Sequence, residues 1–307
     1  MILFRFPAYE EIARQLLVLP SMRLGKFNVA RYENGELYVT LQGPIRGERC
    51  LVLGTIAPPD EQILSFLLLA HTLKKEGANS VTALVPYLAY TRQDKDKPGE
   101  SLATAWSGSL LKCSGIDQLI TVDVHSERDR QLFPFPLVSV STAELFAETI
   151  SKHGLTDATI VAPDNGAIYR CEAVKRAAGM PVGLTPYFEK KRTEKGIVHS
   201  RLVGRVGARA VIIDDMLDTG GTLASACEKL KEASVEEILI LVTHGLFTGS
   251  YWTRLWSLGV TRIFCTDTVP LRAGMATANI SVLSAAPLLI QELSAMDKSI
   301  QRKTAGG

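Results

Sequence analysis

The segment Val211–Leu223 constrains the fold of this chain more than any other part of the sequence. Three β-branched residues lead into the adjacent carboxylates Asp214 and Asp215, and a third carboxylate and the run Thr-Gly-Gly-Thr precede a helical pattern. This order predicts a buried strand, a glycine turn and a helix N-terminus. Such an N-terminus binds anions through its unpaired amides, and glycine lets a phosphate approach the backbone. Carboxylates beside it suit ribose hydroxyls or a hydrated metal, so the segment predicts a sugar-phosphate site.

The same segment also has a purely structural interpretation. It could be an ordinary strand–turn–helix in which Asp218 and Thr219 only cap the helix. A cap needs a single polar side chain, whereas this segment holds the complete order of acids, glycines and threonines. We therefore favour the sugar-phosphate site.

The length and charge of the chain indicate a soluble protein with two domains. Its 307 residues are enough for two domains of about 150 residues each. The net charge of +2 has no dense basic run behind it, so we expect no nucleic-acid partner. No apolar stretch approaches the ~18 residues of a membrane helix, and the first residues lack a signal-peptide pattern. We therefore expect no membrane contact and a cytoplasmic location.

The five cysteines form no site of their own in this interpretation. No pair of them has the spacing of metal ligands or of a redox motif. Most lie in apolar strand or helix patterns, where a free cysteine behaves as a small hydrophobic residue. We expect reduced core residues, in agreement with the cytoplasm.

Strand and helix patterns alternate along the chain. Apolar runs predict strands at 50–56, 80–86, 119–124, 159–162, 211–213, 237–243 and 260–266. Helical patterns lie at 9–19, 60–75, 101–113, 143–153 and 283–296. An Asn-Gly turn between two extended runs predicts a hairpin over 27–39. The fold class is therefore α/β: two tandem doubly wound domains, each a mostly parallel sheet flanked by helices. A boundary near Ser141 gives domains at 1–141 and 142–280.

Two further charged segments can bind phosphate groups. Tyr87–Glu100 follows a strand and holds aromatic residues, Arg92 and Gln93, which can stack a base and hold phosphate oxygens. Tyr187–Gly196 holds three consecutive cations, which can fold over a polyphosphate and neutralise charge during transfer. By composition alone, each segment would be an exposed, mobile loop.

The segment Val211–Leu223 resembles the 5-phosphoribosyl-1-pyrophosphate signature of type I phosphoribosyltransferases and of ribose-phosphate pyrophosphokinases, and by itself it does not choose between them. Residues 86–94 are similar to the pyrophosphokinases' Pro-Tyr-x-x-Tyr-x-Arg-Gln-Asp motif, which the phosphoribosyltransferases lack. The sequence is therefore identified as a member of the ribose-phosphate pyrophosphokinase family, with a resemblance from about Asn28 to Pro270. Membership implies two domains of the type I phosphoribosyltransferase kind, with 281–307 as a C-terminal helix that packs back on the first domain.

The resemblance implies an ATP site on the first domain. Arg92, Gln93 and Asp94 would contact ATP. The predicted hairpin matches the family's aromatic-x-Asp-Gly-Glu segment, which reaches the adenine of ATP bound to a neighbouring subunit. The matching residues are Tyr32, Asn34 and Glu36. Asparagine in place of the usual aspartate keeps an acceptor and loses a charge. A shared ATP site implies a homodimer or a higher homo-oligomer, whereas the structural alternative is a plain hairpin.

The resemblance also implies Mg²⁺ as the cofactor. His125 stands at the histidine of the family's Val-Asp-x-His motif, and Asp164 stands at its second metal-site carboxylate. Magnesium prefers oxygen ligands, so contact between His125 and the metal through a water or a phosphate stays open. Many bacterial members have two glycines after this carboxylate, and Gly166-Ala167 is closer to archaeal-type members.

The segment Tyr187–Gly196 resembles the family's flexible catalytic loop, Lys-x-Arg. The match makes Lys190 the catalytic lysine and Arg192 its companion on the transferring phosphates, while Lys191 leaves a register shifted by one residue open. The implied reaction moves the diphosphoryl group of Mg-ATP to the anomeric hydroxyl of ribose 5-phosphate, giving AMP and 5-phosphoribosyl 1-pyrophosphate. Ribose 5-phosphate would be held by Asp214, Asp215, Asp218, Thr219, Gly220, Gly221 and Thr222.

Three other functions share parts of this pattern. An enzyme for a larger acceptor, such as ADP-ribose, would differ only in the pocket around Thr219–Thr222. A non-catalytic regulatory paralogue would have lost the lysine loop or the Arg-Gln-Asp loop, and both are intact here. A plain phosphoribosyltransferase would need neither the first domain nor the pair Arg92-Gln93.

The chain departs from family members that phosphate and ADP regulate. Those members carry an arginine before the Glu100 position and a serine-rich C-terminus ending near Leu-Phe. This chain has Gly99 and ends Ala305-Gly306-Gly307. We therefore expect neither that control nor the hexamer that creates its site, since a dimer suffices for a shared ATP site.

Overall fold

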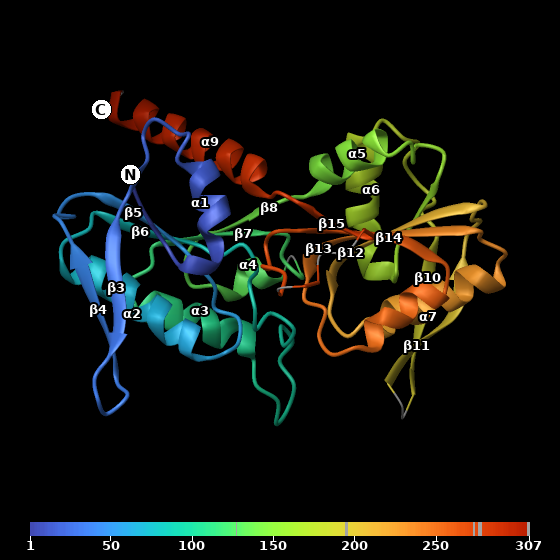
Figure 1. The fold of residues 1–307 in the computed structure, drawn as a ribbon, viewed down its shortest axis with the longest axis horizontal. Helices are drawn as coiled ribbons and strands as arrows, with labels where there is room; N and C mark the ends of the chain where they lie inside the picture. Colours follow the sequence, from blue (N-terminus) through green and yellow to red (C-terminus); the bar gives the residue numbers. More distant parts are fainter. Residues whose placement is uncertain (127, 194–195, 273, 276–277, 306–307) are drawn as a thin grey trace. The chain divides into compact units, whose positions relative to one another are not determined.

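The structure is a computed structural model that describes residues 1–126, 128–193, 196–272, 274–275 and 278–305. Within these ranges, the side chains of 190–200 and 300–305 are not described. The chain divides into two compact units, one made of Met1–Val140 with Ala286–Gly307 and the other of Ser141–Ala285 (Figure 1).

In the described part of the first unit, six parallel strands form one sheet. Its strands, in spatial order, are β2 (Arg23–Leu24), β1 (Ile2–Arg5), β5 (Arg49–Leu53), β6 (Ser80–Leu84), β7 (Gln118–Val122) and β8 (Leu137–Val140). Helices α2 (Glu61–Lys75) and α3 (Ala103–Cys113) cover one face, and α1 (Glu10–Leu16) and α9 (Ala286–Ala305) lie together on the other (Figure 1). The short helices η1 (Pro7–Tyr9) and α4 (Asp129–Leu132) complete the unit.

The C-terminal helix α9 belongs to the first unit. Its Leu289 and Leu293 are buried. Asp297 accepts a hydrogen bond from the Ser21 hydroxyl at 2.5 Å and pairs with Arg49 at 2.8 Å. The last helix therefore packs on the sheet that the first residues of the chain build.

A two-stranded hairpin stands beside this sheet. Strands β3 (Lys26–Arg31) and β4 (Leu37–Gln42) pair antiparallel, and Gly35 in the connecting turn has φ +90°. A left-handed conformation is what an Asn-Gly turn provides. The hairpin predicted over 27–39 is confirmed.

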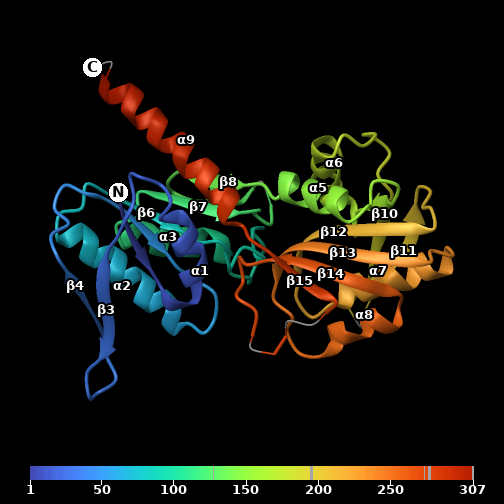
Figure 2. The same cartoon turned by 45° about the horizontal axis from the view of Figure 1, so that its top comes forward.

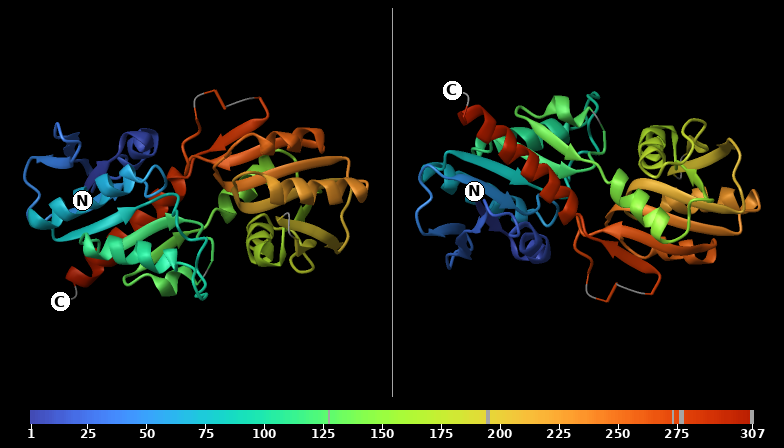
Figure 3. Two further views of the ribbon diagram at one scale, coloured as in Figure 1. Left: turned by 90° about the horizontal axis from the view of Figure 1, so that it is seen from below. Right: turned by 90° about the horizontal axis from the view of Figure 1, so that it is seen from above.

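In the described part of the second unit, five strands form a second parallel sheet. Its strands, in spatial order, are β15 (Ile280–Leu283), β14 (Val260–Thr266), β13 (Glu237–Gly245), β12 (Arg209–Leu217) and β9 (Thr159–Val161). Helices α5 (Ala143–Lys152) and α6 (Ile168–Ala177) cover one face, and α7 (Gly221–Glu232) and α8 (Arg254–Ser257) cover the other (Figures 2 and 3). The short helices η2 (Asn165–Ala167) and η3 (Tyr251–Thr253) lie in connections.

Both faces of this second sheet are apolar because its strands are covered on both sides. In β12, Val211 and Ile213 pack with residues of α5 and α6, whereas Ile212 packs with residues of α7. Successive side chains of a strand point to opposite faces, so a continuous β-branched run suits a sheet with helices on both sides. The predicted α/β class with mostly parallel sheets is confirmed.

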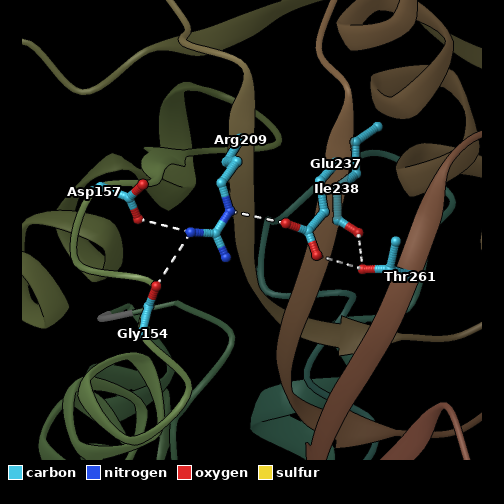
Figure 4. Close-up of polar contacts among 6 residues, drawn as sticks. All are labelled: Gly154, Asp157, Arg209, Glu237, Ile238 and Thr261. Carbon is cyan, nitrogen blue, oxygen red and sulfur yellow. Dashed lines mark hydrogen bonds and ion pairs between the residues drawn. The ribbon is translucent and has the colours of Figure 1, made fainter.

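The amino ends of these strands are joined by one arginine. Arg209 donates from Nε to Glu237 at 2.8 Å, and from Nη1 to Asp157 at 2.8 Å and to the carbonyl of Gly154 at 3.2 Å (Figure 4). The Thr261 hydroxyl donates to the same glutamate at 3.2 Å. This network ties β12, β13 and β14 together at the edge opposite their carboxyl ends.

The segment Tyr187–Gly196, which its composition predicts to be a loop, lies mostly in a strand. Tyr187–Thr193 is strand β10, which pairs antiparallel with β11 (Gly196–Val203), and residues 194–195 between them lie outside the described part. The loop prediction is therefore wrong for β10. Composition shows only that the side chains of this segment are polar. A hairpin forms through backbone pairing and needs few apolar residues, so a polar composition does not exclude it.

None of the helices in the described stretches combines the length and apolarity needed to cross a bilayer.

Candidate functional site

The residues predicted to bind the sugar phosphate lie at the carboxyl edge of the second sheet. Strand β12 runs through Asp214 and Asp215 to Leu217, and α7 begins at Gly221. Gly220 between them has φ +84°, and a Cβ there would lie 2.7 Å from Cα of Trp252. This position therefore needs glycine for both its backbone conformation and its space. The first amides of α7 have no partner inside the helix, and such amides can bind an anion.

A neighbouring loop braces the turn before α7. The amides of Leu246 and Phe247 donate to the carbonyl of Leu217 at 2.9 and 3.0 Å, and the amide of Thr248 donates to the carbonyl of Asp218 at 3.1 Å. Phe247 packs edge-on against Trp252 with ring centroids 5.0 Å apart. Backbone hydrogen bonds thus hold the turn at the two successive residues Leu217 and Asp218, so the turn is braced without a ligand.

Carboxylates gather at the same edge. Asp214 is half-buried and Asp215 is buried, and the amide of Asp215 donates to Oδ1 of Asp214 at 2.9 Å. Burial raises the pKa of Asp214 well above its ordinary value, and the charges of Asp215 and Asp164 raise it further. The structure therefore brings the predicted metal-site carboxylate Asp164 within electrostatic reach of the predicted ribose-binding pair.

The sequence analysis missed Arg170, which belongs to this edge. The side chain lies on the first turn of α6 and is buried, and its positive charge lowers the pKa of Asp214. Its guanidinium also donates to the Tyr169 hydroxyl at 3.1 Å. A buried arginine needs a charged partner. The available signal was an arginine only six residues after Asp164, in the helix that follows η2.

The predicted ATP residues lie at the carboxyl edge of the first sheet. Arg92 and Gln93 are exposed on the loop after β6, whereas Asp94 is buried. The carbonyl of Gln93 accepts from the amide and hydroxyl of Thr104 at 3.3 and 3.2 Å, and its side chain accepts from Ser101. Bonds to the start of α3 therefore fix the loop, and the Arg92 side chain remains accessible to solvent.

The hairpin tip presents the three other predicted ATP contacts. Tyr32, Asn34 and Glu36 are all exposed. Oδ1 of Asn34 accepts from the amide of Glu36 at 3.1 Å, an Asx-type bond that closes the turn. An aspartate would accept the same bond, which explains physically why the asparagine is tolerated.

The predicted metal residues belong to different units. His125 is exposed in the loop after β7 of the first unit, and Asp164 lies after β9 in the second, where its Oδ1 accepts from the amide of Ala167 at 3.0 Å. Across the residues described, no group of three His, Cys, Asp or Glu side chains is arranged to hold a metal. Magnesium usually takes one or two protein carboxylates and completes its shell with waters and substrate phosphates. The oxygen donors around Asp164 and Asp214 fit that requirement.

The predicted catalytic residues Lys190 and Arg192 lie on β10. Their side chains lie outside the described part, and the structure describes only their backbone. The pairing of β10 with β11 changes register between Glu189 and Lys190.

Two parallel sheets, each with helices on both faces and with polar groups for phosphate at its carboxyl edge, define a tandem phosphoribosyltransferase-type fold. Residues 1–115 match the N-terminal domain of ribose phosphate pyrophosphokinase, and residues 131–262 match the phosphoribosyl transferase domain. The chain belongs to the ribose-phosphate pyrophosphokinase family. The N-terminal match excludes a plain phosphoribosyltransferase.

Individual relatives agree over nearly the full length of the chain. The ribose-phosphate pyrophosphokinase of Chromobacterium violaceum is 30% identical over 95% of this chain and 90% of its own length. That of Campylobacter jejuni is 30% identical over 94% of this chain and 93% of its own. The crystal structure of phosphoribosylpyrophosphate synthetase from Mycobacterium smegmatis superimposes with a TM-score of 0.86 at 28% identity, covering 97% of this chain and 99% of that one. These relatives are bacterial, so the archaeal-type resemblance expected from Gly166-Ala167 is not borne out.

Proposed function

We propose that this protein transfers the β,γ-diphosphoryl group of ATP to the anomeric hydroxyl of ribose 5-phosphate. The hydroxyl oxygen bonds to the β-phosphorus, the bond from that phosphorus to the α-phosphate oxygen breaks, and the hydroxyl proton passes to solvent. The products are AMP and 5-phosphoribosyl 1-pyrophosphate. The observation that carries the proposal is a braced glycine turn beside paired carboxylates, in a chain that belongs to this family.

The acceptor would be bound by the turn before α7. Amides of Thr219–Thr222 hold the 5-phosphate, and Asp214 and Asp215 accept hydrogen bonds from the 2- and 3-hydroxyls. Asp218 precedes the turn and completes the predicted set. Holding the sugar at both ends aims its anomeric oxygen, and fixed orientation supplies much of the rate enhancement.

The donor would be bound on the first unit. Arg92 and Gln93, with Asp94 behind them, hold ATP, and the hairpin tip of a second subunit closes over the base through Tyr32, Asn34 and Glu36. A homodimer or a larger homo-oligomer is therefore part of the proposal. Lys190 and Arg192 offset the charge that develops on the transferred group.

Magnesium is the proposed cofactor. When bound, Mg²⁺ would neutralise part of the charge on the ATP phosphates. His125 and Asp164 are the proposed metal contacts, and the histidine would act directly or through a water or a phosphate. We also propose the cytoplasm as the location, because all five cysteines are free thiols.

Product analysis tests the function. The protein is incubated with Mg-ATP and ribose 5-phosphate, in parallel with ADP-ribose, and products are identified by ³¹P NMR. We expect equal amounts of AMP and 5-phosphoribosyl 1-pyrophosphate, and no comparable product from ADP-ribose. AMP release without a pyrophosphorylated ribose 5-phosphate would overturn the proposal, and a product only with ADP-ribose would replace the acceptor.

A further inference from the structure

Two charged side chains of α6 hold the backbone of one residue, Gly183, in the segment that leads into β10. Glu172 accepts from the amide of Gly183 at 2.7 Å, and Nζ of Lys175 donates to the carbonyl of the same residue at 3.0 Å. The two side chains also pair with each other at 3.1 Å, and their exposed fractions are only 17% and 11%. Both backbone polar groups of Gly183 are therefore bound by one nearly buried ion pair.

Thr185 is the second point of attachment. Lys175 donates to the Thr185 hydroxyl at 3.1 Å, and that hydroxyl donates to Glu172. Burial alone would raise the pKa of Glu172, but the hydrogen bonds from Thr185, Gly183 and Lys175 lower it below its ordinary value. We call the set of Glu172, Lys175, Gly183 and Thr185 the α6 clamp.

The side chains next to the attachment points have little packing of their own. Val182 and Leu184 have exposed fractions of 57% and 100%, and Leu184 has φ +44°. A left-handed conformation is unfavourable for leucine, so surrounding contacts must hold it. Since these apolar side chains contribute little burial, the hydrogen bonds of the clamp are the main contacts that fix the segment.

The clamp ends where β10 begins. The carbonyl of Pro186 accepts from the amide of Ala162 at 2.8 Å, Tyr187 forms a bridge with Ala162, and Phe188 is fully buried. Gly204 at the end of β11 approaches so closely that a Cβ there would lie 3.1 Å from Cα of Pro186. The root of the hairpin is thus attached to the end of β9, the strand that leads to Asp164.

We infer that Glu172 and Lys175 are positioning residues for Lys190, and this inference rests on the proposed function. They fix the point at which β10 leaves the core of the second unit. The backbone at Lys190 therefore has one position relative to that core. Lys190 lies two residues beyond the buried Phe188, at most about 7 Å along the strand. A shift of about 1 Å in a catalytic group can lower a rate a hundredfold.

A double replacement separates positioning from stability. Removing one partner of a buried ion pair leaves an unpaired charge, whereas replacing both by apolar residues is often neutral or stabilising. We therefore compare Glu172→Met/Lys175→Met with wild type, and use Arg209→Met/Glu237→Met as the matched control. The control removes an ion pair of the same unit at the opposite edge of the sheet. The measurements are kcat, KM for both substrates, Tm, and hydrogen exchange at the amides of Tyr187–Glu189.

We expect the clamp double variant to keep a Tm near that of wild type and to lose about tenfold or more in kcat, with KM values changed less than about threefold. Exchange at Tyr187–Glu189 should accelerate. Thr185→Val, which removes one attachment, should lose less in kcat. The control pair should leave kcat and this exchange unchanged. Wild-type kcat in the clamp variant at a matched Tm would overturn the inference.

Hydrogen exchange separates this inference from the proposed function. If wild type makes no 5-phosphoribosyl 1-pyrophosphate, the proposed function fails, but the exchange rates still test the clamp. Unchanged exchange at Tyr187–Glu189 in the double variant would then overturn the inference, whereas faster exchange would support the clamp as the anchor of the hairpin.

Discussion

The amide of Asp215 donates a hydrogen bond to Oδ1 of Asp214 at 2.9 Å, so two neighbouring acids are held at one strand end. Burial and the charge of Asp215 raise the pKa of Asp214 well above its ordinary value. The folded protein therefore binds a proton on the Asp214 carboxyl group more tightly than the unfolded protein does. The resulting stability is fully present below the unfolded-state pKa and is lost as pH rises through the folded-state pKa.

Asp214→Asn should therefore stabilise the folded protein and at the same time lower its activity. At pH 7.5, without Mg²⁺ or substrates, we expect Tm to rise by roughly 2–4 °C, or about 1 kcal/mol, because solvent reaches part of the side chain. The gain should shrink as pH falls toward about 4. The ratio kcat/KM for ribose 5-phosphate should drop about a hundredfold, since a ribose hydroxyl loses its charged acceptor. Calorimetry across pH and steady-state kinetics give both values, and a lower Tm at pH 7.5 would contradict the argument.

Gly220→Ala should damage the phosphate turn. Gly220 combines φ +84° with a Cβ position 2.7 Å from Cα of Trp252, so an alanine meets both strain and backbone. We expect the KM for ribose 5-phosphate to rise at least about a hundredfold and stability to fall by about 2 kcal/mol. Gly221→Ala is the matched control for stability, because its Cβ would find no atom closer than 3.9 Å. Equal unfolding midpoints for the two variants would count against this account.

Lys190→Ala should abolish turnover and leave ATP binding within about tenfold of wild type, because the lysine acts mainly on the transition state. Single-turnover kinetics and calorimetric ATP titration measure the two quantities separately. Lys191→Ala tests the register and should retain most of the turnover. The reverse result, with Lys191 essential and Lys190 dispensable, would move the catalytic role by one residue.

Local signals were enough to predict the strand and the helix that carry the proposed acceptor site. The β-branched run, the acids and the Gly-Gly turn of Val211–Leu223 specify a strand and a helix N-terminus through short-range conformational preferences. The structure has β12 (Arg209–Leu217) and α7 (Gly221–Glu232) there. Strand β12 nevertheless continues through Asp214 and Asp215, because its pairing with β13 extends to Leu217 and Gly245.

Features that depend on tertiary contacts were not predictable in the same way. Strand β1 is only Ile2–Arg5, too short to show a periodicity, and it becomes a strand by pairing with β2 and β5. Arg170 was missed because its role depends on Asp214, which is distant in sequence. From the sequence alone, the clamp residue Lys175 would be a lysine on the surface of a helix. Only the folded structure shows its hydrogen bond to the carbonyl of Gly183.

A shared ATP site predicts complementation between two inactive variants. In a mixed dimer, the intact hairpin tip of an Arg92→Ala subunit would close the ATP site of a subunit that carries Tyr32→Ala and Glu36→Ala. That one site has every proposed ATP contact. With random association, half of the dimers are mixed and each has one complete site, so about a quarter of wild-type activity should return. The measurement is turnover before and after the two variants are unfolded together and refolded.

The hairpin tip is suited to this test because changes there should not disturb the fold. Tyr32 and Glu36 are exposed, and the Asx bond that closes the turn comes from the side chain of Asn34, which stays in place. Each variant refolded alone should remain inactive with a wild-type Tm, which excludes simple recovery of folding. If the mixture gains nothing although mixed dimers form, each subunit must complete its own ATP site, and the hairpin would then serve only a structural role.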